Sequence, residues 1–284
     1  MNLKQYLTKA KKEGWGIGQF NFSTLEQLRA ILEAAKETKS PVILGTSEGE
    51  SKFLGLAEIM ALFEITKSKY KINAFINLDH GKSFDWLKKA IDIGYDAVHF
   101  DGCELPLEKN IKQTKKIVQY AHKKGVWVEG ELGKIKGESK LHESGFALEK
   151  EDFTSPDEVA KFIKETGVDS LAVSVGTIHG IYREATKKID FERLKEINKI
   201  SKVPLVLHGG SGVLDEEIKK AILFGITKIN FNTEIRLAWK SGLDEYFKNN
   251  PTELKPYKIL EAVQKTIQKK IEEKINLLNC KGKL

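Results

Sequence analysis

Three histidines lie at or just after the ends of short apolar segments that are rich in β-branched residues. They are His80, His179 and His208, on three separate segments of the chain. A single histidine in such a place is more often structural than a ligand, but parallel strands bring their ends to one edge. Three imidazoles can hold a catalytic zinc ion that keeps an open coordination position. Nitrogen ligands suit Zn²⁺, Fe²⁺ or Co²⁺ better than Mg²⁺. We therefore predict a divalent metal site at these histidines.

The other three histidines are weaker candidates. His99 lies in the middle of an apolar segment, where we expect it to face a helix layer rather than the site. His122 lies among lysines in a helical stretch and is expected to be solvated. His142 lies in a long polar loop, and its role stays open.

A glycine-rich segment, His208-Gly209-Gly210-Ser211-Gly212, begins at the last of the three candidate ligands. Glycines allow backbone N–H groups to approach an anion closely, and a serine adds a hydroxyl donor. The next apolar run ends in the polar stretch 230–233. A glycine cluster alone could be a tight turn, but the loops after the last two strands of a barrel often bind phosphate. We predict a phosphate site beside the metal.

Carboxylates lie at the ends of three segments, Asp79 on the segment that carries His80, and Asp101 and Glu131 on two others. Asp79 directly precedes His80, and strand alternation would point the two side chains to opposite faces unless the chain turns there. A free carboxylate near a metal-bound carbonyl can move a hydroxyl proton. A metal that stabilises an enediolate, together with Asp79 as the base, describes retro-aldol cleavage of a phosphorylated ketose. An imine formed on Lys228 is the least favoured alternative.

These residues need a scaffold, and the order of elements predicts one. Short strand-like runs alternate with amphipathic helical stretches over nearly the whole chain, which indicates an α/β fold with a parallel sheet. The eight predicted strands are Gly16–Phe22, Pro41–Ser47, Ile72–Asp79, Ala97–Gly102, Val126–Gly133, Ser170–Gly176, Pro204–Gly209 and Ile226–Thr233. Eight strands favour a closed (β/α)8 TIM barrel over an open doubly wound sheet.

The barrel is expected to occupy the whole chain as one domain, residues 1–284, with residues 234–284 as C-terminal helices. A long polar segment, Lys134–Thr154, interrupts the alternation after the fifth strand. Loops of this length inside a compact domain are usually functional.

Composition excludes several classes of protein. The chain has 284 residues, of which 40% are hydrophobic, so it can bury a full core. Its two cysteines form no CxxC pair, which argues against a cysteine zinc cage and for a reducing compartment. No apolar run is long enough for a membrane span, and the first residues do not resemble a signal peptide. We predict a cytoplasmic protein that does not bind membranes.

The formal net charge of +7 could indicate nucleic-acid binding. Its basic excess is almost all lysine, interleaved with glutamate at helical spacing, which is typical of solvated helix faces. A nucleic-acid groove would favour clustered arginine and aromatic residues. We therefore expect no nucleic-acid partner, and note that a basic surface attracts an anionic substrate.

Several of these segments together resemble the class II, metal-dependent fructose-bisphosphate aldolases and their tagatose-bisphosphate relatives. The resemblance covers almost the whole chain. It is carried by Gly18-Gln19-Phe20-Asn21, Ser40-Pro41-Val42-Ile43-Leu44-Gly45, Leu78-Asp79-His80-Gly81, Val128-Glu129-Gly130-Glu131-Leu132-Gly133, Val175-Gly176-Thr177-Ile178-His179-Gly180-Ile181-Tyr182, Leu205-Val206-Leu207-His208-Gly209-Gly210-Ser211-Gly212 and Lys228-Ile229-Asn230-Phe231-Asn232-Thr233-Glu234.

The resemblance implies a role for each matching position. His80, His179 and His208 would hold zinc, Asp79 would be the catalytic carboxylate, and Asp101 with Glu131 would form a second metal site. The substrate and its phosphate would be bound by Asn21, Ser47, Gly180, Gly209, Gly210, Ser211, Asn230, Asn232 and Thr233. The resemblance also implies a monovalent cation near the phosphate and a homodimer or homotetramer.

Three departures from the family pattern concern the substrate. The family's Gly-Gly-x-Glu-Asp segment is replaced by Lys136-Gly137-Glu138-Ser139-Lys140, in which Ser139 falls at the position of the acid that protonates the enediolate. Glu138, shifted by one residue, and Glu143 are the candidates for that role, which stays open between them. Arg183 stands where relatives often carry lysine and is a candidate phosphate contact. No arginine follows Arg236, so Lys255 or Lys258 would have to bind the far phosphate.

The leading hypothesis is reversible cleavage of fructose 1,6-bisphosphate into dihydroxyacetone phosphate and glyceraldehyde 3-phosphate. Tagatose 1,6-bisphosphate or another phosphorylated ketose is the alternative substrate. A non-catalytic sugar-phosphate-binding barrel is a third hypothesis, since fold alone does not determine function.

Overall fold

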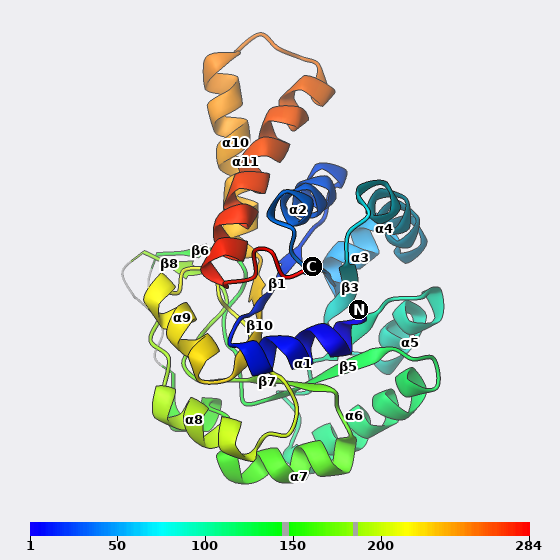
Figure 1. Ribbon diagram of the computed structural model, residues 1–284, viewed down its shortest axis with the longest axis vertical. Helices are drawn as coiled ribbons and strands as arrows, with labels where there is room; N and C mark the ends of the chain where they lie inside the picture. Colours follow the sequence, from blue (N-terminus) through cyan, green and yellow to red (C-terminus); the bar gives the residue numbers. More distant parts are fainter. Residues whose placement is uncertain (144–147, 184–186) are drawn as a thin grey trace.

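The computed structural model describes residues 1–143, 148–183 and 187–284, and in them a closed parallel barrel (Figure 1). Around the barrel the strands follow the order β1-β10-β9-β7-β5-β4-β3-β2. Their bounds are β1 Ile17–Asn21, β2 Val42–Ser47, β3 Ala74–Gly81, β4 Ala97–Phe100, β5 Trp127–Leu132, β7 Ser170–Val173, β9 Leu205–Leu207 and β10 Ile226–Phe231. The prediction of a (β/α)8 barrel is therefore confirmed.

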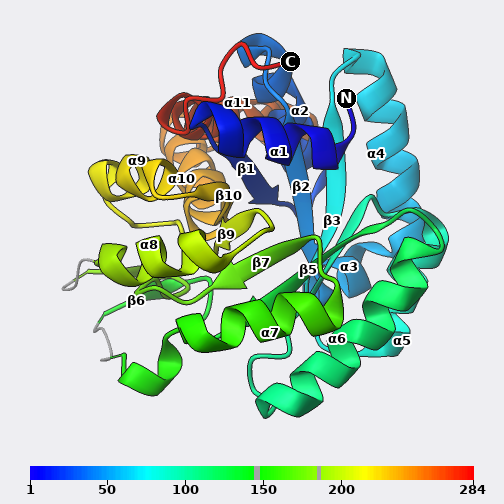
Figure 2. The same cartoon turned by 60° about the horizontal axis from the view of Figure 1, so that its bottom comes forward.

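Helices follow the strands and surround the barrel (Figure 2). They are α1 Leu3–Glu13, α2 Leu25–Thr38, α3 Glu48–Leu54, α4 Leu56–Tyr70, α5 Phe84–Ile93, α6 Leu107–His122, α7 Pro156–Thr166, α8 Phe191–Ile200, α9 Asp215–Leu223, α10 Thr233–Asn249 and α11 Pro256–Leu277. Thr24 and Ser83 cap α2 and α5 with their hydroxyl oxygens. Gly94 ends α5 at φ 104°, a left-handed conformation that favours glycine.

Helices α10 and α11 pack against each other and extend away from the barrel as a hairpin (Figure 1). The end of α11 returns to the barrel, where Ile271, Ile275 and Leu278 are buried and α11 packs on α2. Among the described residues, no helix combines the length and apolar character that crossing a bilayer requires.

The loop between β5 and α7 has more structure than its sequence suggested. Within it, β6 (Leu141–His142) pairs in parallel with β8 (Ile181–Tyr182), which follows β7, and a short 3-10 helix, η1, covers Lys150–Asp152. This two-stranded sheet brings the loop after β5 next to the segment that carries His179. Residues 144–147 of the loop lie outside the described residues.

The core divides into two zones. Apolar side chains fill the space between the strands and the surrounding helices, with Phe20 and Phe231 stacked at 5.8 Å. The barrel interior is polar instead, because Gln19, Asn77 and Glu129 are buried there among hydrogen-bonding partners. This buried polar layer lies below the carboxyl ends of the strands and supports the side chains of the site.

Candidate active site

The loops at the carboxyl ends of the strands enclose a cavity of about 540 Å³. Its described lining includes nearly all the residues that the sequence selected for the site: Asn21, Ser47, Asp79, His80, Asp101, Glu138, His179, Gly180, His208, Gly209, Ser211, Asn230, Asn232 and Thr233. Strands β1, β2, β3 and β10, the loops after β4, β5, β7 and β9, and the junction of β10 with α10 supply them. A volume of this size suits a sugar phosphate.

The imidazoles of His80, His179 and His208 lie side by side in the cavity. The ring centroids of His179 and His208 are 4.8 and 4.7 Å from that of His80. The two nitrogens that face each other most closely are His80 Nε2 and His208 Nδ1, 3.0 Å apart. Burial first, and then the neighbouring imidazoles, lower the pKa of His179 well below its ordinary value, which favours the neutral form that binds metals.

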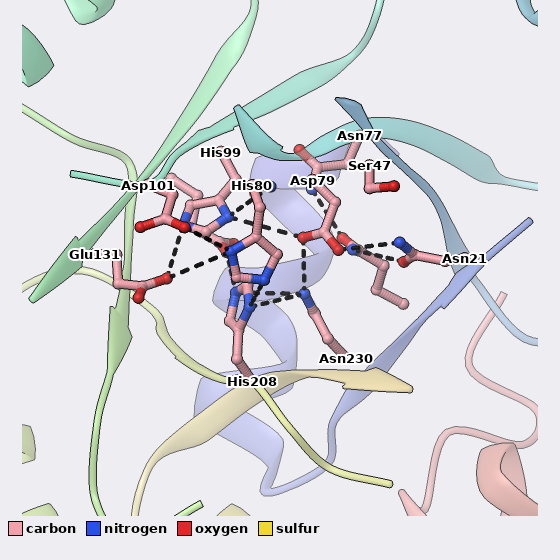
Figure 3. A network of polar contacts seen from close by, with 12 residues as sticks. Asn21, Ser47, Asn77, Asp79, His80, His99, Asp101, Glu131, His208 and Asn230 are labelled. Carbon is pink, nitrogen blue, oxygen red and sulfur yellow. Dashed lines mark hydrogen bonds and ion pairs between the residues drawn. The ribbon is translucent and has the colours of Figure 1, made fainter. Parts of the chain in front are cut away.

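In His80 and His208, the ring nitrogen on the opposite edge contacts a carboxylate. Asp101 Oδ2 lies 3.1 Å from His80 Nδ1, and Glu129 Oε1 lies 2.8 Å from His208 Nε2. A carboxylate accepts the N–H of each of these ring nitrogens, so the opposite nitrogens, His80 Nε2 and His208 Nδ1, are the ones available to a metal ion. Figure 3 shows Asp101 and Glu131 on one side of the rings and Asp79 with its amide partners on the other.

One proton shared between these two nitrogens gives an ordinary hydrogen bond, and a metal ion could take the place of that proton. Two nitrogens bound at ~2.0–2.1 Å to one tetrahedral zinc ion lie a little over ~3 Å apart, close to the separation of His80 Nε2 and His208 Nδ1. The donor set of imidazoles and carboxylates therefore fits a divalent metal ion.

His99 is a site residue that the sequence analysis placed wrongly. It faces the barrel interior rather than the helix layer, is fully buried, and accepts a hydrogen bond from the backbone N–H of His80 at 3.1 Å. Its Nε2 lies 3.1 Å from Glu131 Oε2. Its neighbours in β4, Val98 and Phe100, are apolar and suit the layer between the strands and the helices. Because side chains alternate along a strand, His99 then points into the barrel.

The ligating atoms gather in two groups among the described residues. Asp79, His80, His99 and His208 form one, and His80, Asp101 and Glu131 form the other. His179 belongs to neither by atom distance, although its ring packs on His80. Glu131 Oε2 is buried without a hydrogen bond of good geometry, and a buried carboxylate oxygen in that state is suited to a cation.

Asp79 and His80 both point into the cavity, although they are adjacent in β3. His80 has a left-handed backbone, with φ 50°, and the pairing of β3 with β4 shifts between Leu78 and Gly81. This irregularity cancels the alternation that would otherwise separate the two side chains. The departure costs backbone energy and places a carboxylate beside an imidazole.

Two amides hold the Asp79 carboxylate. Asn21 Nδ2 donates to Oδ2 at 3.0 Å and Asn230 Nδ2 donates to Oδ1 at 3.2 Å. Burial on its own raises the pKa of Asp79, but the charge of His80 above all lowers it, and the pKa lies well below its ordinary value. Asp79 is therefore ionised and oriented to accept a proton.

Below the imidazoles, Glu129 forms a buried ion pair with Lys228, at 2.7 Å between Oε2 and Nζ. Burial alone raises the pKa of Glu129, yet the ammonium of Lys228 and the His208 hydrogen bond lower it. The pair keeps Lys228 bound to a carboxylate, which argues against an imine role for this lysine. Sequence analysis missed Glu129, although it lies two residues before Glu131 on the same face of β5.

The substrate-side residues are connected through Glu50, which sequence analysis also missed. Its carboxylate accepts from Asn21 Nδ2 at 3.1 Å, from the Ser47 backbone N–H at 2.8 Å and from Arg236 Nη2 at 2.8 Å. The available signal was the capping box of α3, in which Ser47 is followed three residues later by Glu50. Arg236 lines the cavity one helical turn after Thr233.

Several predicted contacts lie outside this arrangement. Arg183 pairs with Glu143, its side chain is 64% exposed, and it is absent from the described lining of the cavity. Gly210 is also absent from that lining, and a Cβ there would lie 2.6 Å from Ile229. Its small size is needed for packing. Lys258 pairs with Glu253 at the start of α11, and neither Lys255 nor Lys258 is among the described lining residues.

Glu138 lines the cavity at its rim. Its carboxylate pairs with Lys140 at 2.6 Å, and this contact lowers its pKa. Arg236, Lys82 and Lys136 are the cationic side chains on the same lining. Sequence analysis had named none of the three as substrate contacts.

Comparison with known proteins agrees with this geometry. The profile of the family described as fructose-bisphosphate aldolase class-II matches residues 1–283. The chain belongs to this family. The resemblance noted from the sequence is thereby confirmed.

Individual relatives cover nearly the full length. The fructose-bisphosphate aldolase of Staphylococcus aureus strain Mu50 is 39% identical over 280 residues, 96% of each chain. The probable fructose-bisphosphate aldolase of Bacillus subtilis strain 168 is 38% identical over the same share. The crystal structure of the YdjI aldolase of Escherichia coli K12 superposes with a TM-score of 0.86 at 30% identity, covering 99% of this chain and 98% of that one.

Proposed function

We propose that this class II aldolase cleaves fructose 1,6-bisphosphate reversibly into dihydroxyacetone phosphate and glyceraldehyde 3-phosphate. The observation that carries the proposal is the close approach of the ring nitrogens of His80 and His208, next to the oriented carboxylate of Asp79 and the Gly209–Ser211 loop. The relatives from Staphylococcus aureus and Bacillus subtilis, named as fructose-bisphosphate aldolases, support the choice of sugar.

His80, His179 and His208 are the residues that we propose as zinc ligands, with Asp101 and Glu131 as a second position. When bound there, the ion supplies a Lewis acid for the ketose carbonyl. Asp101 and Glu129 orient the rings through the nitrogens that face away from the ion.

Asp79 moves the proton. The hydroxyl group beside the breaking carbon–carbon bond gives its proton to the carboxylate, and the aldehyde half leaves. The electron pair of that bond stays with the ketone half, whose carbon is then protonated. Glu138 is our candidate for this second proton, because it is the carboxylate of the β5–α7 loop that lines the cavity.

The phosphate of the ketone half is assigned to Gly180, Gly209, Ser211, Asn230 and Thr233. The loop after β9 offers its backbone here, since Gly209 has φ 66° and a Cβ would lie 2.5 Å from the Ile178 carbonyl oxygen. Asn21, Ser47 and Asn232 lie on the side of the cavity toward Arg236, where the rest of the sugar would extend.

A cytoplasmic homodimer or homotetramer, without a nucleic-acid or membrane partner, completes the proposal. The two cysteines are unpaired in the structure, Cys280 buried and Cys103 half-buried, as suits a reducing compartment.

Another phosphorylated ketose, such as tagatose 1,6-bisphosphate, is the second candidate substrate. A ketose with a single phosphate is favoured by the state of Arg236, whose guanidinium is already bound to Glu50 and to the carbonyl oxygen of Ser139. Tagatose 1,6-bisphosphate carries the same second phosphate as the fructose substrate. The YdjI relative is also named an aldolase without a named sugar.

The test is cleavage of both bisphosphates by purified protein, read through a coupled triose-phosphate assay before and after treatment with EDTA. We expect activity on the fructose substrate that EDTA abolishes and added Zn²⁺ restores. Activity that survives complete metal removal would contradict the proposal. Turnover of neither sugar by zinc-loaded protein, with binding retained, would favour a non-catalytic sugar-phosphate-binding barrel.

A further inference from the structure

Lys187 is a buried lysine to which the proposed mechanism assigns no role. Lys187 is only 5% exposed, and its Nζ donates to the backbone carbonyl oxygens of Gly209, at 2.8 Å, and of Ser211. Backbone pairing of Lys187 with Val213 holds it beneath the loop after β9. The amine thus lies directly behind the glycine-rich loop, on the side away from the cavity.

The backbone of the loop is polarised by this arrangement. The carbonyl groups of Gly209 and Ser211 point to Lys187, whereas the N–H groups of the same two residues have no acceptor within the described chain. Both residues line the cavity. Successive N–H groups arranged in this way form an anion-binding concavity, and the carbonyl groups behind them form a cation-binding one.

The charge of Lys187 lacks a partner of its own. Of the ion pairs recorded between described residues, none includes Lys187. The acid whose charge acts on it, Glu234, is already bound by Lys274 at 2.7 Å and by the Gly212 N–H at 3.0 Å. Burial lowers the pKa of Lys187 to about 7. A buried amine of this kind is most stable as an ammonium when an anion lies close by.

We propose that Lys187 is the built-in cation of the phosphate loop. Its ammonium fixes the Gly209 and Ser211 carbonyl groups and supplies the positive charge that a bound alkali cation would otherwise supply. The inference rests on the proposed function in one respect, that the phosphate of the substrate lies in this loop. It makes phosphate binding by this chain independent of potassium and sodium, contrary to the expectation from the family resemblance.

The test uses inorganic phosphate as the probe and isothermal titration calorimetry as the readout, on zinc-loaded protein. Wild type is titrated in choline chloride and in KCl of equal ionic strength. We expect the same Kd in both salts. A wild-type Kd that tightens severalfold in KCl would overturn the proposal, because an alkali cation would then still be required.

Lys187→Met removes the charge, and Lys187→Gln keeps a donor for the carbonyl groups without the charge. Both should weaken phosphate binding by ~10- to 100-fold in choline chloride, the scale of a charge-assisted contact. Potassium or ammonium ions should restore part of the lost affinity, because they can bind the Gly209 and Ser211 carbonyl groups in place of the missing ammonium. Lys188→Met, at the exposed neighbouring lysine, should match wild type.

Unchanged phosphate affinity in either folded variant would contradict the inference, and so would a loss that no monovalent cation restores, since that pattern indicates a structural role. In steady-state kinetics of the two Lys187 variants with fructose 1,6-bisphosphate, we expect KM to rise by a larger factor than kcat falls. If the protein cleaves no bisphosphate but phosphate binding still follows Lys187, the proposed reaction fails and the inference stands.

Discussion

His80 Nε2 and His208 Nδ1 lie 3.0 Å apart across the barrel, although the two residues are separated by 128 positions in the chain. Each ring is held in this orientation by a carboxylate on its other nitrogen, Asp101 for His80 and Glu129 for His208. The ring nitrogens of the proposed metal site are thus oriented by acids on the opposite edge of each imidazole, and Glu129 is in turn held by Lys228.

The first prediction concerns Glu129, the acid that orients His208. Glu129→Gln should lower zinc affinity by ~10- to 100-fold, because the neutral amide no longer increases the basicity of the ring. It should also destabilise the protein by ~3–5 kcal/mol, since Lys228 loses its buried partner. Competition with a zinc chelator measures the first effect and denaturant unfolding of the apo protein the second.

The double variant Glu129→Gln/Lys228→Met separates the two effects. Removing both charges should recover most of the stability but not the zinc affinity. Recovery of zinc affinity together with stability would show that Glu129 acts on the fold alone.

The second prediction concerns Asp79, which two amides orient in the cavity. Asp79→Asn should lower kcat by ~10²- to 10⁴-fold, the usual contribution of a positioned acid–base group. Zinc content, measured by atomic absorption, should stay near one equivalent if the imidazoles are the ligands. A variant that loses both zinc and activity would identify Asp79 as a ligand instead of a base.

The sequence was sufficient to predict the barrel, because β-α alternation and the bounding glycines and caps are local signals. It also located the strand ends where His80, His179 and His208 lie. It could not show that Asp79 turns toward His80, since this depends on a left-handed residue and a register shift in β3. The parallel pairing of β6 with β8 was likewise hidden, because it joins two loops that are far apart in the chain.

His99 shows a different limit. Its apolar neighbours in β4 contained the signal for an inward side chain, but a buried histidine inside a barrel needs partners that only the fold supplies. Here these are the His80 backbone N–H and the Glu131 carboxylate. The role of Glu50 depends in the same way on Arg236, which reaches it from a different part of the chain.

The third prediction concerns pH and the carboxyl group of Asp96, which is not among the described residues that line the cavity. Burial raises the pKa of Asp96 above its ordinary value, and a hydrogen bond from the Ile76 N–H opposes the shift. A raised folded-state pKa means that the carboxyl group favours folding below its unfolded pKa of ~3.9 and that this benefit is lost as the pH rises through the folded-state pKa.

Asp96→Asn keeps an oxygen that can accept from Ile76 but carries no charge. The variant should therefore have a higher Tm than wild type near pH 7, and the difference should vanish near pH ~3, where both side chains are neutral. Scanning calorimetry of both apo proteins across this range is the measurement. Two Tm curves that stay parallel at every pH would refute the assignment.

The fourth prediction concerns the proton that the ketone half receives. Glu138→Gln should lower kcat by ~10²-fold with little change in KM, if its carboxyl group leaves Lys140 and enters the cavity during turnover. The matched control is Glu143→Gln, because Glu143 is an exposed acid of the same loop that pairs with Arg183. A larger loss of kcat in the Glu143 variant would show that Glu143, and not Glu138, donates the proton.

The fifth prediction concerns the far phosphate of a bisphosphate substrate. Arg236 lines the cavity and is held by Glu50 at 2.8 Å, so its guanidinium is positioned to exchange this contact for a phosphate. Arg236→Met should raise KM for fructose 1,6-bisphosphate by ~10-fold or more, the scale of a lost charged contact. It should leave kcat/KM for fructose 1-phosphate nearly unchanged, because that sugar lacks the second phosphate.

Lys258→Met is the control, since Lys258 pairs with Glu253 at the start of α11 and is not among the described residues that line the cavity. We expect steady-state kinetics of this variant to match wild type for both sugars. The reverse pattern, with Lys258→Met selectively impaired on the bisphosphate, would place the second phosphate on α11. Because α11 begins at the tip of the hairpin that extends from the barrel, such a contact would have to reach the site of a neighbouring copy. The same pair of variants therefore also tests whether the active site is completed within one chain.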